Sequence, residues 1–143
     1  MAINRILIVE DDLDDRELLD DAMKQANPSV NLIFAENGLD ALRYLEQIKE
    51  NPAQLPCLIV LDLNLPFIDG IETYRRIQEH VLFKEVPIII FTSSMNPADR
   101  DFFESLGVKF MTKPDQFNVI HEAVLQMLHT CKEHWAQRDV SKN

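Results

Sequence analysis

Residues 59–66 read IVLDLNLP, in which an aliphatic run leads into Asp62 and then into a turn that ends at Pro66. An apolar run of this length, bounded by turn residues, is typical of a buried strand in a parallel sheet. Asp62 would then lie at the carboxyl end of the strand, where open α/β sheets bind their ligands. This stretch therefore predicts the fold class and the position of a site together.

Three further apolar segments end in polar residues in the same manner. Residues 6–9 are followed by Glu10, Asp11 and Asp12, residues 88–91 by Thr92, Ser93 and Ser94, and residues 109–112 by Lys113 and Pro114. If these segments are neighbouring parallel strands, three carboxylates, a hydroxyl and an ammonium meet at one edge of the sheet. Such a group of side chains can bind a divalent metal ion and a phosphoryl group.

The length and charge of the chain narrow the classes of function. Its 143 residues favour one domain with a sizeable core. The formal net charge of −10 argues against binding to nucleic acid or to an anionic membrane, because like charges repel.

No segment approaches the roughly 18 apolar residues that span a bilayer, and the first strand leaves no room for a signal peptide. We therefore expect a cytoplasmic protein, in which Cys57 and Cys131 are reduced structural thiols.

Strand and helix patterns alternate about five times along the chain, which predicts a parallel sheet with helices on both faces. The expected strands are Arg5–Val9, Asn31–Ala35, Leu58–Leu61, Val86–Phe91 and Lys109–Thr112. The expected helices are residues 14–26, one after Gly38, one after Gly70, one capped by Asn96 with Pro97 in its first turn, and residues 117–131. Residues 1–131 form the predicted domain, and residues 132–143 are a polar tail or an extension of the last helix.

The acidic residues after the first strand suit a hard cation. Mg²⁺ prefers oxygen ligands in near-octahedral geometry and usually keeps several waters. The candidates for direct ligands are Asp11 and Asp62, with Glu10 or Asp12 acting through water. Asp14 and Asp15 are interpreted differently, as acids that the helix dipole favours at a helix N-terminus.

Asp62 also suits a role as a nucleophile. A carboxylate beside other carboxylates needs a cation to stay ionised, and its free oxygen can then take a phosphoryl group. Phosphoryl transfer mainly requires positioning and neutralisation of the equatorial oxygens. Lys113 can supply a point charge to one oxygen and Thr92 a hydrogen bond to another. The order acids, Asp, Thr, Lys at successive strand ends is more informative than any of these residues alone.

From about residue 4 to residue 131, the chain resembles the receiver domain of two-component response regulators. The matching motifs are residues 8–11, residues 61–66 with Asp69 and Gly70, residues 91–94, and Lys113 with Pro114. The resemblance implies an α/β fold of the (βα)5 flavodoxin-like type, with a doubly wound parallel sheet in the order 2-1-3-4-5. It also implies a phosphoacceptor signalling protein, not an enzyme, that promotes its own Mg²⁺-dependent phosphorylation and dephosphorylation.

The resemblance assigns roles to the acidic residues and to their neighbours. Asp62 would accept a phosphoryl group from a sensor histidine kinase. The implied Mg²⁺ ligands are Asp11, Asp62 and the Asn64 backbone carbonyl, with Glu10 as an outer acidic partner.

On the other strands, the resemblance implies that Thr92 and Lys113 contact the phosphate and that the Lys113–Pro114 peptide is cis. Phe110 stands at the aromatic switch position, where the ring turns inward as Thr92 moves toward the phosphate. The alternative for Phe110 is a plain buried strand residue.

Some features depart from the common receiver pattern. Asp115 and Gln116 stand where many receivers have an aromatic residue, and residues 46–57 and 78–87 are longer than in minimal receivers. With the end of the chain soon after the last helix, these features resemble stand-alone receivers that partner bacterial phytochromes. Output would then be contact with an unknown downstream protein through the fourth helix, fifth strand and fifth helix. Trp135, four residues after Cys131, is a candidate homodimer contact.

Other functions compete with a phosphorylation switch. A phosphorelay intermediate or phosphate sink, which passes the group to a histidine phosphotransfer protein, would use the same residues. A phosphatase resembling haloacid dehalogenases is disfavoured, because Asn64 replaces the second aspartate. A flavin or dinucleotide binder is disfavoured because the chain has only 3 Gly and no phosphate-binding glycine loop. Residues 11–15 lack the glycine and the distal glutamate of an EF-hand.

Overall fold

The computed structural model describes residues 4–115 and 119–141, with side chains as far as His134. The strands are β1 (Arg5–Val9), β2 (Asn31–Ala35), β3 (Leu58–Leu61), β4 (Ile88–Thr92) and β5 (Lys109–Thr112). The α-helices are α1 (Leu13–Ala26), α2 (Gly38–Ile48), α3 (Gly70–Glu79), α4 (Pro97–Ser105) and α5 (Ile120–Ser141). A short 3-10 helix, η1 (Pro52–Gln54), precedes β3.

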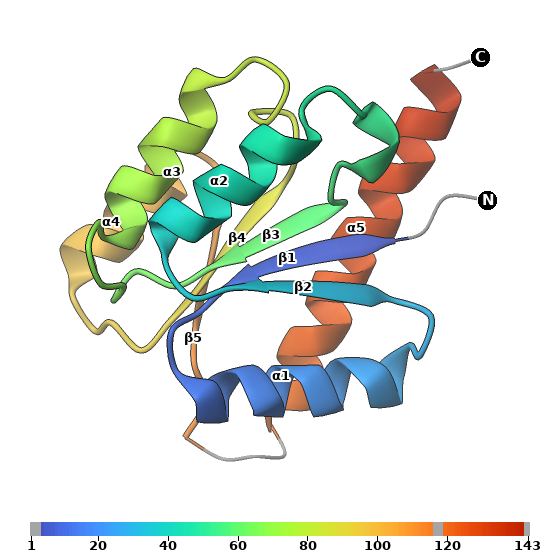
Figure 1. The fold of residues 1–143 in the computed structure, drawn as a ribbon. Coiled ribbons are helices and arrows are strands. Elements are labelled where there is room, and N and C mark those ends of the chain that lie inside the picture. Colours follow the sequence, from blue (N-terminus) through green and yellow to red (C-terminus); the bar gives the residue numbers. More distant parts are fainter. Residues whose placement is uncertain (1–3, 116–118, 142–143) are drawn as a thin grey trace.

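The strands form one parallel sheet in the order β2-β1-β3-β4-β5. Helices α1 and α5 cover one face of this sheet, and α2, α3 and α4 cover the other (Figure 1). The fold class and the strand order predicted from the sequence are confirmed. No helix among the described residues is long and apolar enough to cross a membrane.

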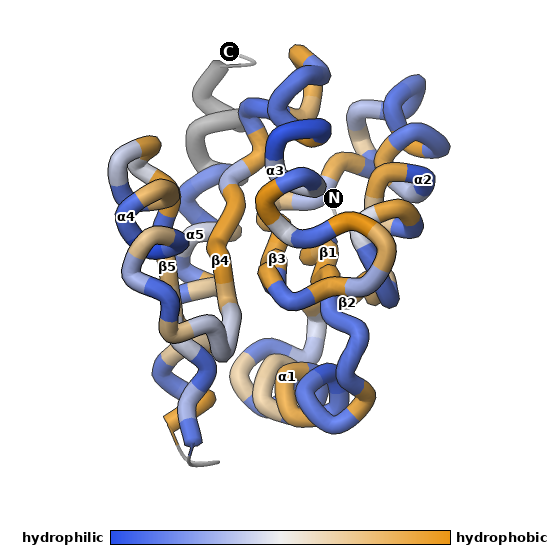
Figure 2. Tube along the Cα trace, turned by 90° about the vertical axis from the view of Figure 1, so that its left-hand side faces the viewer, coloured by the Kyte–Doolittle hydropathy of each residue, from blue (hydrophilic) through white to orange (hydrophobic). Residues whose placement is uncertain are grey.

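The apolar runs of the sequence form the middle of the sheet. Every residue of β3 and β4 is buried, and the chain is largely orange along both strands when coloured by hydropathy (Figure 2). Side chains alternate between the two faces of a sheet. In β1, Ile6 and Ile8 pack toward α1 and α5, whereas Leu7 and Val9 pack on the opposite side. Because both faces are covered, the strands read as continuous apolar runs.

Polar caps and one glycine set the ends of the helices. The Asp12 carboxylate accepts a hydrogen bond from the Asp15 N–H at 3.0 Å and caps α1. Asn96 caps α4 as predicted, and Gly107 follows α4 with a φ of +75°, a left-handed conformation that favours glycine. The predicted start of the last helix at Phe117 lies outside the described residues.

One element boundary differs from the prediction, and a second agrees with one of two alternatives. β4 begins at Ile88 and not at Val86, because the Val86 N–H bonds to the Phe83 carbonyl in a turn and Pro87 has no N–H for a ladder. α5 continues as one helix past Cys131 to Ser141, which agrees with the predicted alternative that residues after 131 extend the last helix. The side chain of Trp135 lies outside the described residues, so its part in a homodimer stays a prediction.

Gly70 allows the chain to fold back closely behind Asp62. Its N–H donates to the Leu63 carbonyl at 3.0 Å. A Cβ at position 70 would collide with the Asp62 carbonyl oxygen and with the Cα of Leu63. The start of α3 therefore packs directly against the loop that leaves β3, and only a glycine leaves room for this approach.

The two cysteines correct a prediction. Cys57 precedes β3 and Cys131 lies in α5, and the structure joins them in a disulfide with a Cα–Cα distance of 4.8 Å. The expectation of reduced thiols is wrong for this structure. The two residues are 74 positions apart in sequence, and only the packing of α5 on the sheet brings them together.

Candidate functional site

The predicted acidic residues meet at the carboxyl edge of the sheet. Glu10 and Asp11 follow β1, and Asp62 follows the adjacent strand β3. One carboxylate oxygen from each of the three residues lies within 4.8 Å of the others. Glu10 is 2% exposed and Asp62 4% exposed, whereas Asp11 is exposed to solvent. The cluster is thus buried at its base and open on one side.

Backbone and side-chain donors hold the Asp62 carboxylate from two directions. Its Oδ1 accepts hydrogen bonds from the N–H groups of Leu63 at 2.7 Å and Asn64 at 3.3 Å. Its Oδ2 accepts one from the Lys113 ammonium at 2.9 Å. The Asp62 N–H bonds to the Val9 carbonyl, which fixes the backbone to β1. The side chain therefore has a defined orientation.

Lys113 contacts three carboxylates at once. Its Nζ lies 2.6 Å from Glu10 Oε1, 2.7 Å from Asp15 Oδ2 and 2.9 Å from Asp62 Oδ2. Asp15 corrects a prediction, because its carboxylate belongs to this network and does not serve only the helix dipole. No sequence signal separated Asp15 from Asp14, because the helix dipole favours an acid at both positions.

The pKa values of Glu10 and Lys113 reflect this environment. Burial raises the pKa of Glu10 to about 7, and the charge of Asp62 adds to the rise, although the contact with Lys113 opposes it. Burial lowers the pKa of Lys113, but hydrogen bonds with Asp15, Glu10 and Asp62 outweigh it and leave this pKa above its usual range. Lys113 is therefore a permanent cation, and the acids around it exceed its charge.

Thr92 lies at the end of β4, fully buried, beside Lys113. The Lys113 N–H donates to the Thr92 carbonyl at 2.8 Å. The Thr92 hydroxyl oxygen accepts a hydrogen bond from the Ser94 N–H at 3.2 Å. The Ser94 hydroxyl donates to Asp99 in α4 at 2.7 Å. These contacts connect the end of β4 with the first turn of α4.

Phe110 lies in β5, half-buried, and contacts α4. The Arg100 guanidinium stacks over its ring at 4.8 Å from the centroid and donates to the Thr112 hydroxyl at 3.0 Å. Arg100 also pairs with Glu104 at 3.3 Å. Sequence reasoning missed Arg100, because neither its spacing nor its neighbours mark it among the other exposed residues of the helix.

The Lys113–Pro114 peptide is trans, since the described residues contain no cis peptide bond. The expectation of a cis peptide is therefore wrong for this structure. A proline reduces the preference of the preceding peptide bond for trans but does not reverse it. Trans is therefore the ordinary state of a bond that precedes proline.

The cluster fits a hard divalent cation. Two ligands on opposite sides of Mg²⁺ are about 4.2 Å apart, from metal–oxygen distances of about 2.1 Å. The spread of the three carboxylate oxygens, within 4.8 Å, matches this span after small side-chain rotations. The donors are all oxygens, and three carboxylates lie here around the single ammonium of Lys113, with Asp15 as a further acid. A cation would balance the remaining negative charge.

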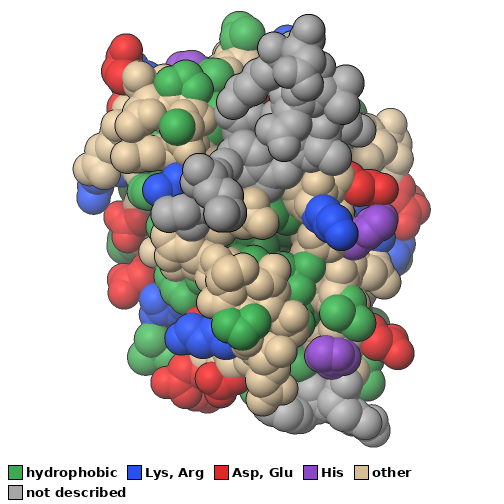
Figure 3. Space-filling model, turned by 90° about the vertical axis from the view of Figure 1, so that its right-hand side faces the viewer, with side chains coloured by type: hydrophobic (Ala, Val, Ile, Leu, Met, Phe, Trp, Pro, Cys, Tyr) green, Lys and Arg blue, Asp and Glu red, His purple; other side chains and the backbone are tan. Residues whose placement is uncertain are grey.

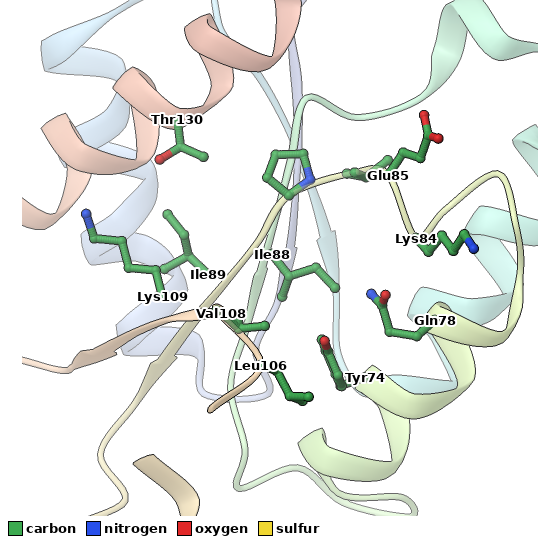
Figure 4. Close-up of a pocket in the computed structure, with 13 residues that line it drawn as sticks. Tyr74, Gln78, Lys84, Glu85, Ile88, Ile89, Leu106, Val108, Lys109 and Thr130 are labelled. Atoms are coloured by element: carbon green, nitrogen blue, oxygen red, sulfur yellow. The ribbon is translucent and has the colours of Figure 1, made fainter. Parts of the chain in front are cut away.

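The described part of the molecule also has a cavity at the amino edge of the sheet, opposite the edge that carries the acidic cluster. It measures about 360 Å³, and Tyr74, Ile88, Leu106, Val108, Lys109 and Thr130 are among its lining residues (Figure 4). Its floor is apolar, and its polar groups stand apart around the rim (Figure 4). None of the predicted site residues lines it, so the acidic cluster is the candidate site.

A family model matches most of the chain. The model describes the response regulator receiver domain and matches residues 6–125. Two curated relatives are response regulator Rcp1 of Synechocystis sp., 37% identical over 95 residues, and the uncharacterized transcriptional regulatory protein YrkP of Bacillus subtilis, 32% identical over 127 residues. These matches cover 66% and 87% of this chain, but only 65% of Rcp1 and 49% of YrkP.

Solved structures extend the comparison over most of the chain. The phosphorylated cyanobacterial phytochrome response regulator RcpA superposes with a TM-score of 0.77 at 30% identity and covers 86% of this chain and 89% of RcpA. The Mn²⁺-bound form of Rcp1 has a TM-score of 0.74 at 32% identity and covers 85% of this chain and 88% of Rcp1. One of these relatives was thus seen phosphorylated, and the other with a divalent metal.

Proposed function

Because the chain belongs to the response regulator receiver family, we propose that it is a single-domain response regulator whose Asp62 accepts a phosphoryl group from a sensor histidine kinase. The observation that carries this proposal is the Lys113 ammonium at 2.9 Å from Asp62 Oδ2, inside a cluster of acids. A partly buried lysine held against a buried aspartate at the end of a central strand suits phosphoryl transfer to a carboxylate, because it positions a positive charge beside the nucleophile.

The transfer follows from the positions of these side chains. A carboxylate oxygen of Asp62 attacks the phosphorus of a phosphohistidine, the P–N bond breaks, and the imidazole nitrogen leaves with the electron pair. Lys113 neutralises one equatorial oxygen, and the Thr92 hydroxyl, once released from Ser94, donates to another. A bound Mg²⁺ would neutralise the remaining charge on the transferring group.

The proposed Mg²⁺ ligands are Asp11, Asp62 and the Asn64 carbonyl, with Glu10 acting through water. The exposed position of Asp11 supports this assignment, because a hydrated Mg²⁺ must keep several waters. The Mn²⁺-bound form of Rcp1 supports a divalent ion in a relative of this chain.

For the switch, we place Thr92 and Phe110 in the coupled roles described for the family. Thr92 moving toward the phosphoryl group would break its bond from the Ser94 N–H, which leads into α4. Phe110 would respond because Arg100 of α4 stacks on its ring.

The partners are proposed from the relatives and from charge. RcpA is a phytochrome response regulator, which supports a kinase of the phytochrome type for this chain. The formal charge of −10 argues against nucleic acid and membrane surfaces as partners. We propose a cytoplasmic protein with its receiver domain in residues 1–131 and a C-terminal extension in residues 132–143. A downstream protein or a second copy would be the partner of its output surface.

Intact mass measured after incubation with acetyl phosphate tests the proposal. With Mg²⁺, the wild type should gain the mass of one phosphoryl group, and EDTA should abolish the gain. Asp62→Asn removes the nucleophile and keeps the volume, so this variant should gain nothing. A phosphorylated Asp62→Asn would show that another residue is the acceptor. A folded wild type that binds Mg²⁺ but gains no mass, even with a cognate kinase, would contradict the proposal.

A further inference from the structure

The disulfide lies at the opposite end of β3 from the phosphoacceptor. Cys57 directly precedes β3, and its N–H donates to the Arg5 carbonyl at the start of β1 at 2.8 Å. Cys131 comes from α5, which packs on the same face of the sheet as α1. The bond therefore ties α5 to the amino end of the central strand, about 16 Å along the strand from Asp62.

The two sulfurs differ in how solvent can reach them. Cys57 is 0% exposed and Cys131 is 2% exposed. Cys131 lines a cavity of about 430 Å³ between α5 and the segment that joins α1 to β2. The other lining residues are Asn4, Asn27, Val30, Leu125, Leu128, His129 and Lys132. Cys57 does not line this cavity, so a reagent that enters it meets Cys131 first.

The charged groups that line the cavity determine whether it favours an anionic or a cationic reagent. His129 and Lys132 contribute nitrogen groups, and no carboxylate belongs to the described lining residues. Glu133 lies nearby but pairs with His129 at 3.0 Å. On the side of the molecule that carries α5, blue and purple side chains lie next to each other, with red side chains beside them (Figure 3). Among the groups that line the cavity itself, the Lys132 ammonium carries a positive charge with no carboxylate in the described lining to oppose it, and this favours an anion over a cation.

We propose that Cys57 and Cys131 form a reversible redox site that exchanges with an anionic low-molecular-weight thiol of the glutathione class. The thiolate of the reagent enters the cavity and attacks Cys131 Sγ, and Cys57 Sγ leaves as a thiolate that takes a proton. A second thiolate attacks the reagent's sulfur in this mixed disulfide, which releases Cys131. In sum, one protein disulfide and two reagent thiols give two cysteine thiols and one reagent disulfide.

The site controls how α5 is anchored. Val124 and Met127 precede Cys131 on the buried side of the helix, whereas α5 continues beyond Cys131 to Ser141. The disulfide is a covalent attachment of this helix at Cys131, the last buried residue among the α5 side chains that the structure describes. Reduction leaves only apolar packing there, so the amides around Cys131 lose protection when the bond opens.

A titration in glutathione buffers tests the exchange, with alkylation in denaturant followed by intact mass. The wild type should gain two alkyl groups in reducing buffers and none in oxidising ones, with both groups appearing together. A gain of two alkyl groups at every ratio of reduced to oxidised glutathione would show that the two thiols never pair. A gain of no alkyl group at every ratio would show that the disulfide never exchanges. Either result overturns the proposal. The titration needs no phosphoryl donor, so it is independent of the phosphorylation assay.

A pair of single variants tests the route through the cavity. Cys57→Ala leaves Cys131 alone, and this variant should form a mixed disulfide with oxidised glutathione in the folded state. Cys131→Ala leaves the fully buried Cys57, which should react only after unfolding. Equal reactivity of the two variants would contradict attack at Cys131. Hydrogen exchange of the wild type should show loss of protection around Cys131 on reduction, and unchanged protection would refute the anchoring role.

Discussion

Lys113 shows how one residue both stabilises and restrains the site. Its ammonium lies within 2.9 Å of carboxylate oxygens from Glu10, Asp15 and Asp62. A phosphoryl group on Asp62 must draw this ammonium away from at least one of these acids. Asp15 is the most exposed of the three, with 34% of its side chain accessible, and is therefore the contact that costs least to break.

Asp15→Asn should speed phosphorylation by acetyl phosphate. The loss of this partly exposed ion pair, worth about 1 kcal/mol, removes a competitor for Lys113 and should raise the rate roughly fivefold. Asp14→Asn is the matched control. Asp14 is an exposed residue in the same first turn of α1, so the variant removes the same charge without touching the contact with Lys113. Equal rates for the two variants would mean that net charge alone, and not the contact with Lys113, limits the reaction.

Glu10 should give the metal-free protein a distinct dependence of stability on pH. Burial raises the pKa of Glu10 from 4.5 to about 7 in the folded state. Between these values the folded protein keeps a proton that the unfolded chain has released, so stability falls as pH rises through this window and levels off above it. The loss attributable to Glu10 should be about 3 kcal/mol.

Urea unfolding in EDTA from pH 4.5 to pH 8 measures this loss, with Glu10→Gln as the reference. The glutamine variant should lack the part of the slope that Glu10 contributes, because it cannot titrate. Parallel curves for the two proteins would show that the Glu10 carboxyl is ionised throughout this range.

At the scale of elements, the loop between β3 and α3 holds the acceptor in place through close packing. Gly70→Ala should therefore disturb Asp62, because the added methyl group collides with the Asp62 carbonyl oxygen. We expect a loss of about 2–3 kcal/mol in the free energy of unfolding and strongly reduced phosphorylation. Gly107→Ala is the contrasting variant, since its Cβ meets no atom within 4 Å and only the φ of +75° opposes it.

Gly107→Ala should cost about 1 kcal/mol and keep normal phosphorylation. Chemical unfolding and the acetyl phosphate assay separate the two glycines. If both variants are phosphorylated at the rate of the wild type, the close approach at Gly70 does not position the acceptor.

The contact between α4 and β5 should be measurable as a coupling energy. Arg100 stacks on Phe110 at 4.8 Å from the ring centroid, whereas Arg75 lies 5.6 Å from the Phe102 ring. A double-mutant cycle with Arg100→Ala and Phe110→Ala should give a coupling of about 0.5–1 kcal/mol. The same cycle at Arg75 and Phe102 should give less. A coupling near zero at Phe110 would remove Arg100 as the residue that transmits movement of α4 to the ring.

At the scale of the whole molecule, the features that were predicted correctly are those that depend on the pattern of apolar and polar residues along the chain. Four apolar runs that end in polar residues, in an alternating chain, predicted the parallel sheet and the meeting of Glu10, Asp11 and Asp62, whereas the strand order came from the resemblance to receiver domains. The sequence could not predict Asp15, because the helix dipole already accounts for an acid there. It also could not pair Cys57 with Cys131, because their contact depends on how α5 packs and not on their spacing.

That pairing leads to a prediction for the stability of the whole chain. The disulfide closes a loop of 74 residues, so it restricts the unfolded chain strongly, and its reduction should lower the free energy of unfolding by about 2–4 kcal/mol. Urea unfolding with and without a reductant measures this difference. Cys57→Ala combined with Cys131→Ala is the control, since its stability should not respond to the reductant. A wild type that is equally stable in both buffers would mean that the bond adds nothing to the packing of α5 against the sheet.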